Sequence, residues 1–266
     1  MRTIAERPRS RALRIALVGT GTGVGKTHVA CALLSCWSRR AAAVGLKPVE
    51  TGISPRGQAR TAGVSSGASD QERLIWAARM FHVKQRGHDK RQPNATEAPL
   101  RSLYAFADPI SPHLAARQAG VRIDLGVIER WVRAHASAVT IIETAGGLFS
   151  PLGYGATNLE LAQTLRPDAV ILVALDRLGV LHELTTTLAL AAARGGPPLG
   201  LVLSTPAKKD ASTGRNATEI EALGIAHPIA VFPRASHQAV ATVEAARRVI
   251  TWIESGGSSS SAAALP

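Results

Sequence analysis

A lysine and a threonine follow a run of glycines near the start of the chain, in Gly19-Thr-Gly-Thr-Gly-Val-Gly-Lys-Thr27. Glycines let successive backbone N–H groups turn toward phosphate oxygens, and a helix that begins at such a loop adds partial positive charge. Lys26 could reach the β- and γ-phosphates of a nucleotide, and the hydroxyl of Thr27 could coordinate Mg²⁺. The residue types and their spacing therefore predict a site for ATP or a related nucleotide.

The elements on either side of this loop have the types that such a site needs. Ile15–Val18 is a short apolar run that predicts a buried strand, and apolar residues at helical spacing follow Thr27. Strand, glycine-rich loop, Lys-Thr and helix is the order found in P-loop nucleotide-binding proteins. Thr20 stands where the usual pattern has its first glycine, so the alternative is a glycine-rich turn without a ligand.

Two other predicted strands end in charged residues. Lys47 ends the predicted strand Ala43–Lys47, and Glu143 follows the predicted strand Val139–Ile142. Open α/β sheets bind ligands at the carboxyl ends of their strands. Glu143 is therefore a candidate Mg²⁺ ligand, while Lys47 is either a ligand-binding or a solvated lysine. Asp70 opens a predicted helix, where it is either a helix cap or a second metal ligand.

Composition and element order predict an α/β fold of the P-loop NTPase class, with a mostly parallel central sheet and helices on both faces. Apolar residues make up 45% of the 266 positions, which supports a sizeable core. We expect a single domain over residues 13–255, with a disordered basic tail at 1–12 and a low-complexity tail at 256–266. No apolar run approaches the roughly 20 residues of a membrane span.

The remaining predicted elements alternate along the chain. Further strands are predicted at 169–175, 199–204 and 229–232. Helices are predicted from Ser69 to about Met80, at about 114–120, at 124–136, from after Gly179 to near Gly195, at about 216–223 and at 237–254. Residues 54–69 and 82–99 are predicted to be surface loops, and residues 104–113 a turn-rich segment.

Charge and cysteine content limit the possible partners and compartments. The net charge of +12 raises the question of nucleic acid, but the arginines are mostly scattered and aromatic residues are only 4% of the chain. We therefore expect no specific nucleic-acid binding. Cys31 and Cys36 lie on one predicted helix with no metal-binding spacing, so they are expected to be free thiols in the cytoplasm.

Five segments together resemble the dethiobiotin synthetase family, in its order and at roughly its spacing. They are Gly19–Thr27, Gly45-Leu-Lys-Pro-Val-Glu-Thr-Gly52, Asp108-Pro-Ile-Ser-Pro-His113, Glu143-Thr-Ala-Gly-Gly147 with Ser150-Pro-Leu152, and Arg177-Leu-Gly179. The resemblance covers about residues 13–235. It implies an ATP- and Mg²⁺-dependent reaction in biotin biosynthesis, in which 7,8-diaminopelargonic acid takes up CO₂ as a carbamate. The carbamate is phosphorylated by ATP, and the second amine closes a cyclic urea.

The resemblance also implies roles for particular residues. Lys26 and Lys47 would stabilise charge between carbamate and triphosphate, and Thr22 would assist by hydrogen bonding. The implied nucleotide site comprises Gly21, Thr22, Gly23, Val24, Gly25, Lys26, Thr27 and Ser204. The implied metal ligands are Thr27, Asp70 and Glu143, which favours the ligand interpretation of Asp70. The implied substrate site comprises Thr51, Gly146, Gly147, Gly179, Val180, Leu181 and His182. The family is typically a homodimer, with the substrate carboxylate held at a helix N-terminus of the partner subunit.

Some positions depart from the family pattern. Ser204 stands in place of an asparagine that reads the adenine edge, Thr144 in place of a glycine and His182 in place of an asparagine. The alternatives to a synthetase are a ParA/MinD-type ATPase and an inactive nucleotide-binding regulator. The first carries a signature lysine where this chain has Gly21. The argument against the second is that the chain retains Lys26, Thr27, Lys47 and Glu143.

Overall fold

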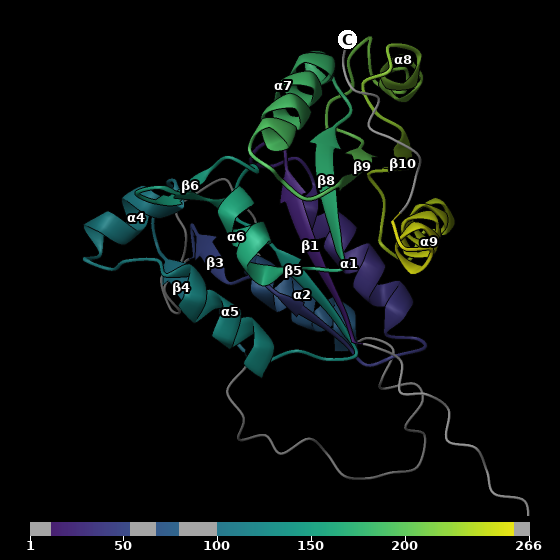
Figure 1. Ribbon diagram of the computed structural model, residues 1–266. Coiled ribbons are helices and arrows are strands. Elements are labelled where there is room, and N and C mark those ends of the chain that lie inside the picture. The colour runs from purple at the N-terminus through teal and green to yellow at the C-terminus, as the bar shows by residue number, and fades with distance from the viewer. Residues whose placement is uncertain (1–11, 54–67, 80–99, 258–266) are drawn as a thin grey trace, which may run out of the picture.

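A six-stranded parallel sheet forms the centre of the computed structural model, which describes residues 12–53, 68–79 and 100–257 (Figure 1). In sheet order the strands are β10 (Pro228–Phe232), β9 (Leu199–Ser204), β8 (Ala169–Leu175), β1 (Leu13–Gly19), β5 (Val139–Glu143) and β2 (Ala43–Leu46). Every neighbouring pair is parallel. Leu17 of β1 is paired with Ile171 on one side and Glu143 on the other, so the carboxyl end of β1 lies between those of β8 and β5.

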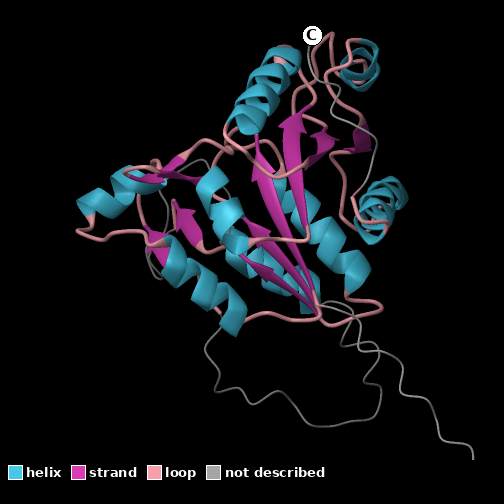
Figure 2. Cartoon of the chain, in the orientation of Figure 1, coloured by secondary structure: helices cyan, strands magenta, loops and turns pink. Residues whose placement is uncertain are grey.

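Helices cover both faces of this sheet, as Figure 2 shows. One face packs against α1 (Lys26–Trp37), α2 (Asp70–Arg79) and α9 (Val240–Glu254); the other packs against α5 (Leu125–Ala134), α6 (Asn158–Leu165), α7 (Val180–Ala193) and α8 (Asn216–Ala222). Successive residues of β1 point to opposite faces. Ile15 and Leu17 join the first core, whereas Ala16 and Val18 join the second. The predicted fold class is confirmed.

Close packing of α2 against β2 brings the first turn of α2 to the carboxyl end of the sheet. A Cβ atom at Gly45 would lie 2.7 Å from both Leu34 Cδ1 and Leu74 Cβ, so only glycine fits between α1 and α2. Another helix, α4 (Pro112–Gln118), begins with proline at its first position, where the missing N–H is not needed.

Several short elements were not predicted. A separate parallel pair joins β3 (Val49–Thr51) to β4 (Tyr104–Phe106), within the predicted turn-rich segment, and β6 (Pro151–Gly153) forms a hairpin with β7 (Ala156–Thr157). Helix α6 was also missed. Its signal was present, because Thr157 and Glu160 form a capping box.

The other predicted elements occur with boundary shifts of a few residues, and β8 and β9 have the predicted bounds. Apart from Ala68 and Ser69, the predicted loops at 54–69 and 82–99 lie outside the described residues, as does Met80. Of the predicted tails at 1–12 and 256–266, only residues 12, 256 and 257 are described. Among the helices in the described ranges, none has the length and apolar character that a membrane crossing requires.

Candidate active site

The glycine-rich loop connects β1 to α1 and is held by main-chain hydrogen bonds to strand β8 and to the loop after β5. Thr20 N donates to Val173 O at 3.0 Å, and Leu148 N donates to Gly19 O at 2.7 Å. Gly25 caps α1 with a φ of 98°, a left-handed conformation that favours glycine. The predicted phosphate-binding loop is therefore a preformed turn at the N-terminus of a helix.

Lys26 lies folded back over this loop. Its Nζ donates to Gly21 O at 3.0 Å, and the side chain is only 6% exposed. Burial lowers the pKa of Lys26 to about 8, although the carboxylates of Glu143 and Asp70 act in the opposite direction. A bound triphosphate would supply the negative charge that favours the protonated amine.

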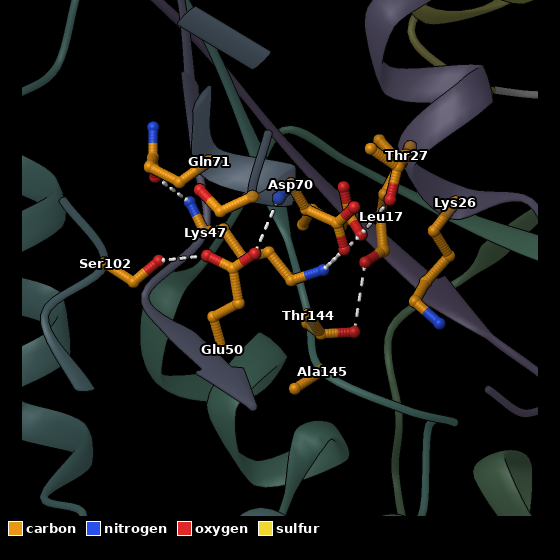
Figure 3. Close-up of polar contacts among 12 residues, drawn as sticks. Leu17, Lys26, Thr27, Lys47, Glu50, Asp70, Gln71, Ser102, Thr144 and Ala145 are labelled. Carbon is orange, nitrogen blue, oxygen red and sulfur yellow. Dashed lines mark hydrogen bonds and ion pairs between the residues drawn. The ribbon is translucent and has the colours of Figure 1, made fainter. Parts of the chain in front are cut away.

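Lys47 lies between two carboxylates in the middle of the site (Figure 3). Its Nζ donates to Glu143 Oε1 at 2.8 Å and also contacts Asp70 Oδ2, while Thr27 Oγ1 donates to Glu143 Oε1 at 2.8 Å. These groups come from the end of β5 and the starts of α1 and α2, together with the residue after β2. The predicted residues Thr27, Lys47, Asp70 and Glu143 thus form one cluster.

Electrostatics in this cluster favour the charged forms. Burial acts to lower the pKa of Lys47, but Glu143 and Asp70 outweigh it, so the pKa is raised above that of a free lysine. Burial acts to raise the pKa of Asp70, but the Lys47 ammonium outweighs it, so the pKa is lowered. Lys47 therefore remains a cation at neutral pH, and at 7% exposed it is a buried lysine and not a solvated one.

The oxygen atoms around Lys47 fit a magnesium site. Mg²⁺ is commonly held by one or two carboxylates together with substrate phosphates and water. The cluster offers the hydroxyl of Thr27 and the carboxylates of Asp70 and Glu143. Glu143 is 1% exposed, and its Oε2 has no hydrogen-bond partner among the described residues. In these same ranges no group of three or more His, Cys, Asp or Glu could hold a metal, so the protein offers a partial ligand set.

Three polar residues that the sequence analysis did not single out surround this cluster (Figure 3). Glu50 Oε1 accepts a hydrogen bond from Asp70 N at 2.6 Å, and Glu50 Oε2 accepts one from Ser102 Oγ at 2.8 Å. Gln71 Oε1 accepts from Lys47 N at 2.7 Å, and its Nε2 donates to Gly45 O at 3.0 Å. Position 50 lies within the Gly45–Gly52 motif, but nothing in its spacing indicated a partner on α2.

The Gly146-Gly147 turn lies against the glycine-rich loop. A Cβ atom at Gly147 would be 2.9 Å from Thr20 O, and one at Gly146 would be 3.7 Å from Thr22 Oγ1. Gly146 has a φ of 78°, which again favours glycine. The structure therefore brings Thr22 beside this turn. Buried Asn158, also missed, holds the turn by donating to Ala145 O at 2.6 Å and Gly147 O at 2.8 Å.

The N-terminus of α7 carries the predicted carboxylate-binding residues. Gly179 is its N-cap with a φ of 94°, Val180 is buried and His182 is exposed. Glu183 in the first turn accepts from Thr20 Oγ1 at 3.1 Å and pairs with Arg177 at 2.6 Å. The glycine-rich loop and the start of α7 are thus joined through a side chain that the sequence analysis missed.

Three other positions from the sequence analysis lie at, or directly after, the ends of strands. Thr51 is half-buried on β3, one residue after Glu50. Thr144 directs its hydroxyl to Leu17 O at 3.1 Å, toward the sheet (Figure 3). Ser204 ends β9 with its hydroxyl against the loop, since a Cβ at Gly25 would lie 2.4 Å from Ser204 Oγ.

Comparisons with known proteins identify a family model and curated relatives of this chain. A family model described as an AAA domain matches residues 14–241. The ATP-dependent dethiobiotin synthetase BioD of Anaeromyxobacter dehalogenans (strain 2CP-C) is 35% identical over 225 residues, covering 82% of this chain and 88% of that protein. The BioD of Nitrosospira multiformis is 37% identical over 185 residues, covering 67% and 70%.

Among solved structures, a plasmid partition protein of Borrelia burgdorferi B31 bound to AMPPNP has a TM-score of 0.52. It is 10% identical and covers 93% of this chain and 100% of that chain. This likeness shows the fold alone, so the ParA/MinD-type alternative is less well supported than a synthetase. The sequence identity to curated relatives over most of their length decides the assignment: the chain belongs to the ATP-dependent dethiobiotin synthetase family.

Proposed function

We propose that this chain converts 7,8-diaminopelargonic acid, CO₂ and ATP into dethiobiotin, ADP and phosphate. The observation that carries the proposal is the position of Lys47, a buried cation that faces both Asp70 and Glu143 beside the phosphate-binding loop. An ammonium group at this point can hold an anionic carbamate close to a triphosphate. Such positioning and charge stabilisation is the main contribution a protein makes to phosphoryl transfer.

Two lysines divide the electrostatic work in this proposal. Lys26, on the glycine-rich loop, neutralises the phosphate oxygens of ATP. Lys47 holds the carbamate and balances the charge that moves from the carbamate to the transferred phosphoryl group. Thr22 donates a hydrogen bond from the loop to the carbamate side of the site. No side-chain nucleophile is required.

The metal proposed for this site is Mg²⁺, held by Thr27, Asp70 and Glu143. Mg²⁺ would supply neutralisation of the phosphate charge and orientation of the phosphoryl group. Two observations support this assignment: the ligand set is all oxygen, and Glu143 Oε2 has no hydrogen-bond partner within the described part of the chain. Lys47 contacts both carboxylates, so a bound metal would share their negative charge with the lysine.

The remaining proposed contacts concern the substrates. We assign the diamine and its carbamate to Thr51 and to the main chain of Gly146 and Gly147. The distal carboxylate is assigned to the N-terminus of α7, at Gly179, Val180, Leu181 and His182, because helix N-termini favour anions. The nucleotide lies along residues 21–27, with Ser204 near its base. A homodimer would bring the start of α7 to the site of the partner subunit, and the free thiols Cys31 and Cys36 support a reducing cytoplasm.

Diamine-dependent phosphate release tests this proposal. The protein is incubated with ATP, MgCl₂ and bicarbonate, with and without 7,8-diaminopelargonic acid, and the product is followed by mass spectrometry. We expect phosphate release only with the diamine, and a product that has gained one carbonyl and lost two hydrogens. Lys47→Met should abolish product while ATP binding remains, whereas Lys209→Met, at an exposed lysine, should leave product formation unchanged. Equal rates of phosphate release with and without the diamine would contradict the proposal and favour a partition-type ATPase.

A further inference from the structure

Glu50 is buried beside the proposed metal site without belonging to it. It lies on β3, is 5% exposed, and directs both carboxylate oxygens to hydrogen-bond donors (Figure 3). One donor is the side chain of Ser102, at 2.8 Å; the other is the backbone N–H of Asp70, at 2.6 Å. A side chain on a different element therefore holds the main chain of a proposed metal ligand.

The contact with Asp70 N is additional to the cap of α2. The first N–H groups of a helix have no partner within the helix. Ser69 Oγ accepts from Glu72 N at 3.2 Å, and Glu72 Oε2 accepts from Ser69 N at 2.8 Å, so these two residues cap the helix reciprocally. Glu50 then takes up the next N–H, from a strand that is 20 positions earlier in the sequence. Its contact therefore sets the position of α2 relative to β3 rather than stabilising the helix end alone.

Glu50 lies in the same segment as two residues of the proposed site. Lys47 lies three positions before it and Thr51 follows it directly. Gln71, the residue after Asp70, accepts a hydrogen bond from Lys47 N at 2.7 Å. The start of α2 is thus attached at two consecutive residues to the segment that carries the proposed carbamate-binding lysine.

We propose that Glu50 is a positioning residue, which holds the main chain of Asp70 so that the Asp70 carboxylate meets Mg²⁺ and Lys47 together. This inference rests on the magnesium site of the proposed function. Groups behind a metal ligand typically change metal affinity by about 10-fold to 100-fold when they are removed. The effect of Glu50 is therefore expected on metal-dependent nucleotide binding and not on nucleotide binding as such.

The test compares the dissociation constant of AMPPNP, measured by calorimetry, in MgCl₂ and in EDTA. Glu50→Met keeps the length of the side chain but removes both acceptors. It should weaken binding by about 10-fold or more in MgCl₂ and leave binding in EDTA unchanged. Glu50→Gln retains an oxygen for Asp70 N and should restore binding close to that of the wild type. Asp70→Asn serves as the reference for loss of the ligand itself.

Glu72→Ala is the matched control, because it removes a carboxylate from the same helical turn without touching the Asp70 N–H. It should change binding equally in both buffers or not at all. If Glu50→Met affects both buffers equally, or if Glu72→Ala reproduces its magnesium-specific loss, Glu50 has only a structural role. If Asp70→Asn weakens AMPPNP binding only in MgCl₂, but Glu50→Met weakens it in neither buffer, the positioning role of Glu50 is overturned and the magnesium site stands. If wild-type binding is the same in both buffers, the magnesium site itself is wrong.

Discussion

Replacing Gly25 with alanine tests whether the phosphate-binding loop depends on contact with the end of β9. The φ of 98° at Gly25 disfavours any side chain, which costs about 1–2 kcal/mol. The new Cβ would also lie 2.4 Å from Ser204 Oγ and 2.9 Å from Ser204 Cβ. Overpacking of this kind costs about 1–3 kcal/mol. We expect Gly25→Ala to lower the free energy of unfolding by about 2–5 kcal/mol.

The contacts of the new Cβ with Ser204 Oγ and Ser204 Cβ predict which second substitution restores stability to Gly25→Ala. The hydroxyl of Ser204 can rotate away from a new methyl group, whereas its Cβ cannot. Ser204→Ala should therefore recover little of the loss, since the 2.9 Å contact remains, and Ser204→Gly should recover the overpacking part but not the backbone strain. Urea unfolding of the singles and doubles measures the coupling as a double-mutant cycle.

The slope of the unfolding free energy against urea concentration should be the same for all variants. Differences between their unfolding midpoints then report differences in stability. ATP affinity, measured on the same variants, should fall with Gly25→Ala and rise again with the added Ser204→Gly. A Gly25→Ala variant as stable as the wild type would refute the reasoning. So would a Ser204→Gly substitution that leaves the effect of Gly25→Ala unchanged, because the strand end and the loop would then be independent.

Three other predictions concern charge and thiol reactivity. Because burial lowers the pKa of Lys26 to about 8, this amine is mostly neutral at pH 9.5. Bound phosphates should restore its proton, so ATP affinity should fall as the pH rises above 8. Calorimetry in two buffers of different ionisation enthalpy should detect about one proton taken up per ATP at pH 9.5, and none for Lys26→Arg, whose guanidinium stays charged. Lys47→Ala leaves the buried Glu143 carboxylate without its cation, so stability in urea should fall by about 3–5 kcal/mol and recover partly with MgCl₂; an unchanged stability would contradict the ion-pair assignment. Burial raises the pKa of Cys31 to about 12, so iodoacetamide at pH 8 should modify Cys31 only after unfolding, and labelling of the native protein at this thiol would contradict its burial.

The sequence predicted the central sheet well because its strands are short apolar runs that end in distinctive residues. Gly19–Thr27 and the Glu143 end of β5 carry local signals that do not depend on distant partners. The pair of β3 and β4 carries no such signal. Each strand has three residues, and each exists because its main chain pairs with a segment about 55 positions away.

In the candidate site, too, residues with a local sequence signal were predicted, and residues whose role depends on distant partners were missed. Most residues that would touch ATP, metal or substrate belong to recognisable motifs. Asp70 does not, yet it lies together with Thr27, Lys47 and Glu143. Glu50 was missed because its role depends on a backbone N–H of a distant helix, which no residue type reports. Asn158 was missed for a similar reason, since its partners are the carbonyl groups of a turn 11 to 13 positions earlier.

The central place of β1 has a consequence for synthesis of the chain. β1 is translated before its sheet partner β8, which follows about 155 residues later, so at roughly 5–20 residues per second it waits on the order of 8–30 s. During this time the edge of β1 that will meet β8 presents unpaired backbone N–H and C=O groups, which could pair with another chain. The hydrogen bond from Thr20 N to Val173 O also forms only then. The loop that would bind ATP is translated before β8, the strand whose Val173 carbonyl holds it. Truncated chains that end before β8 should therefore lack a nucleotide site.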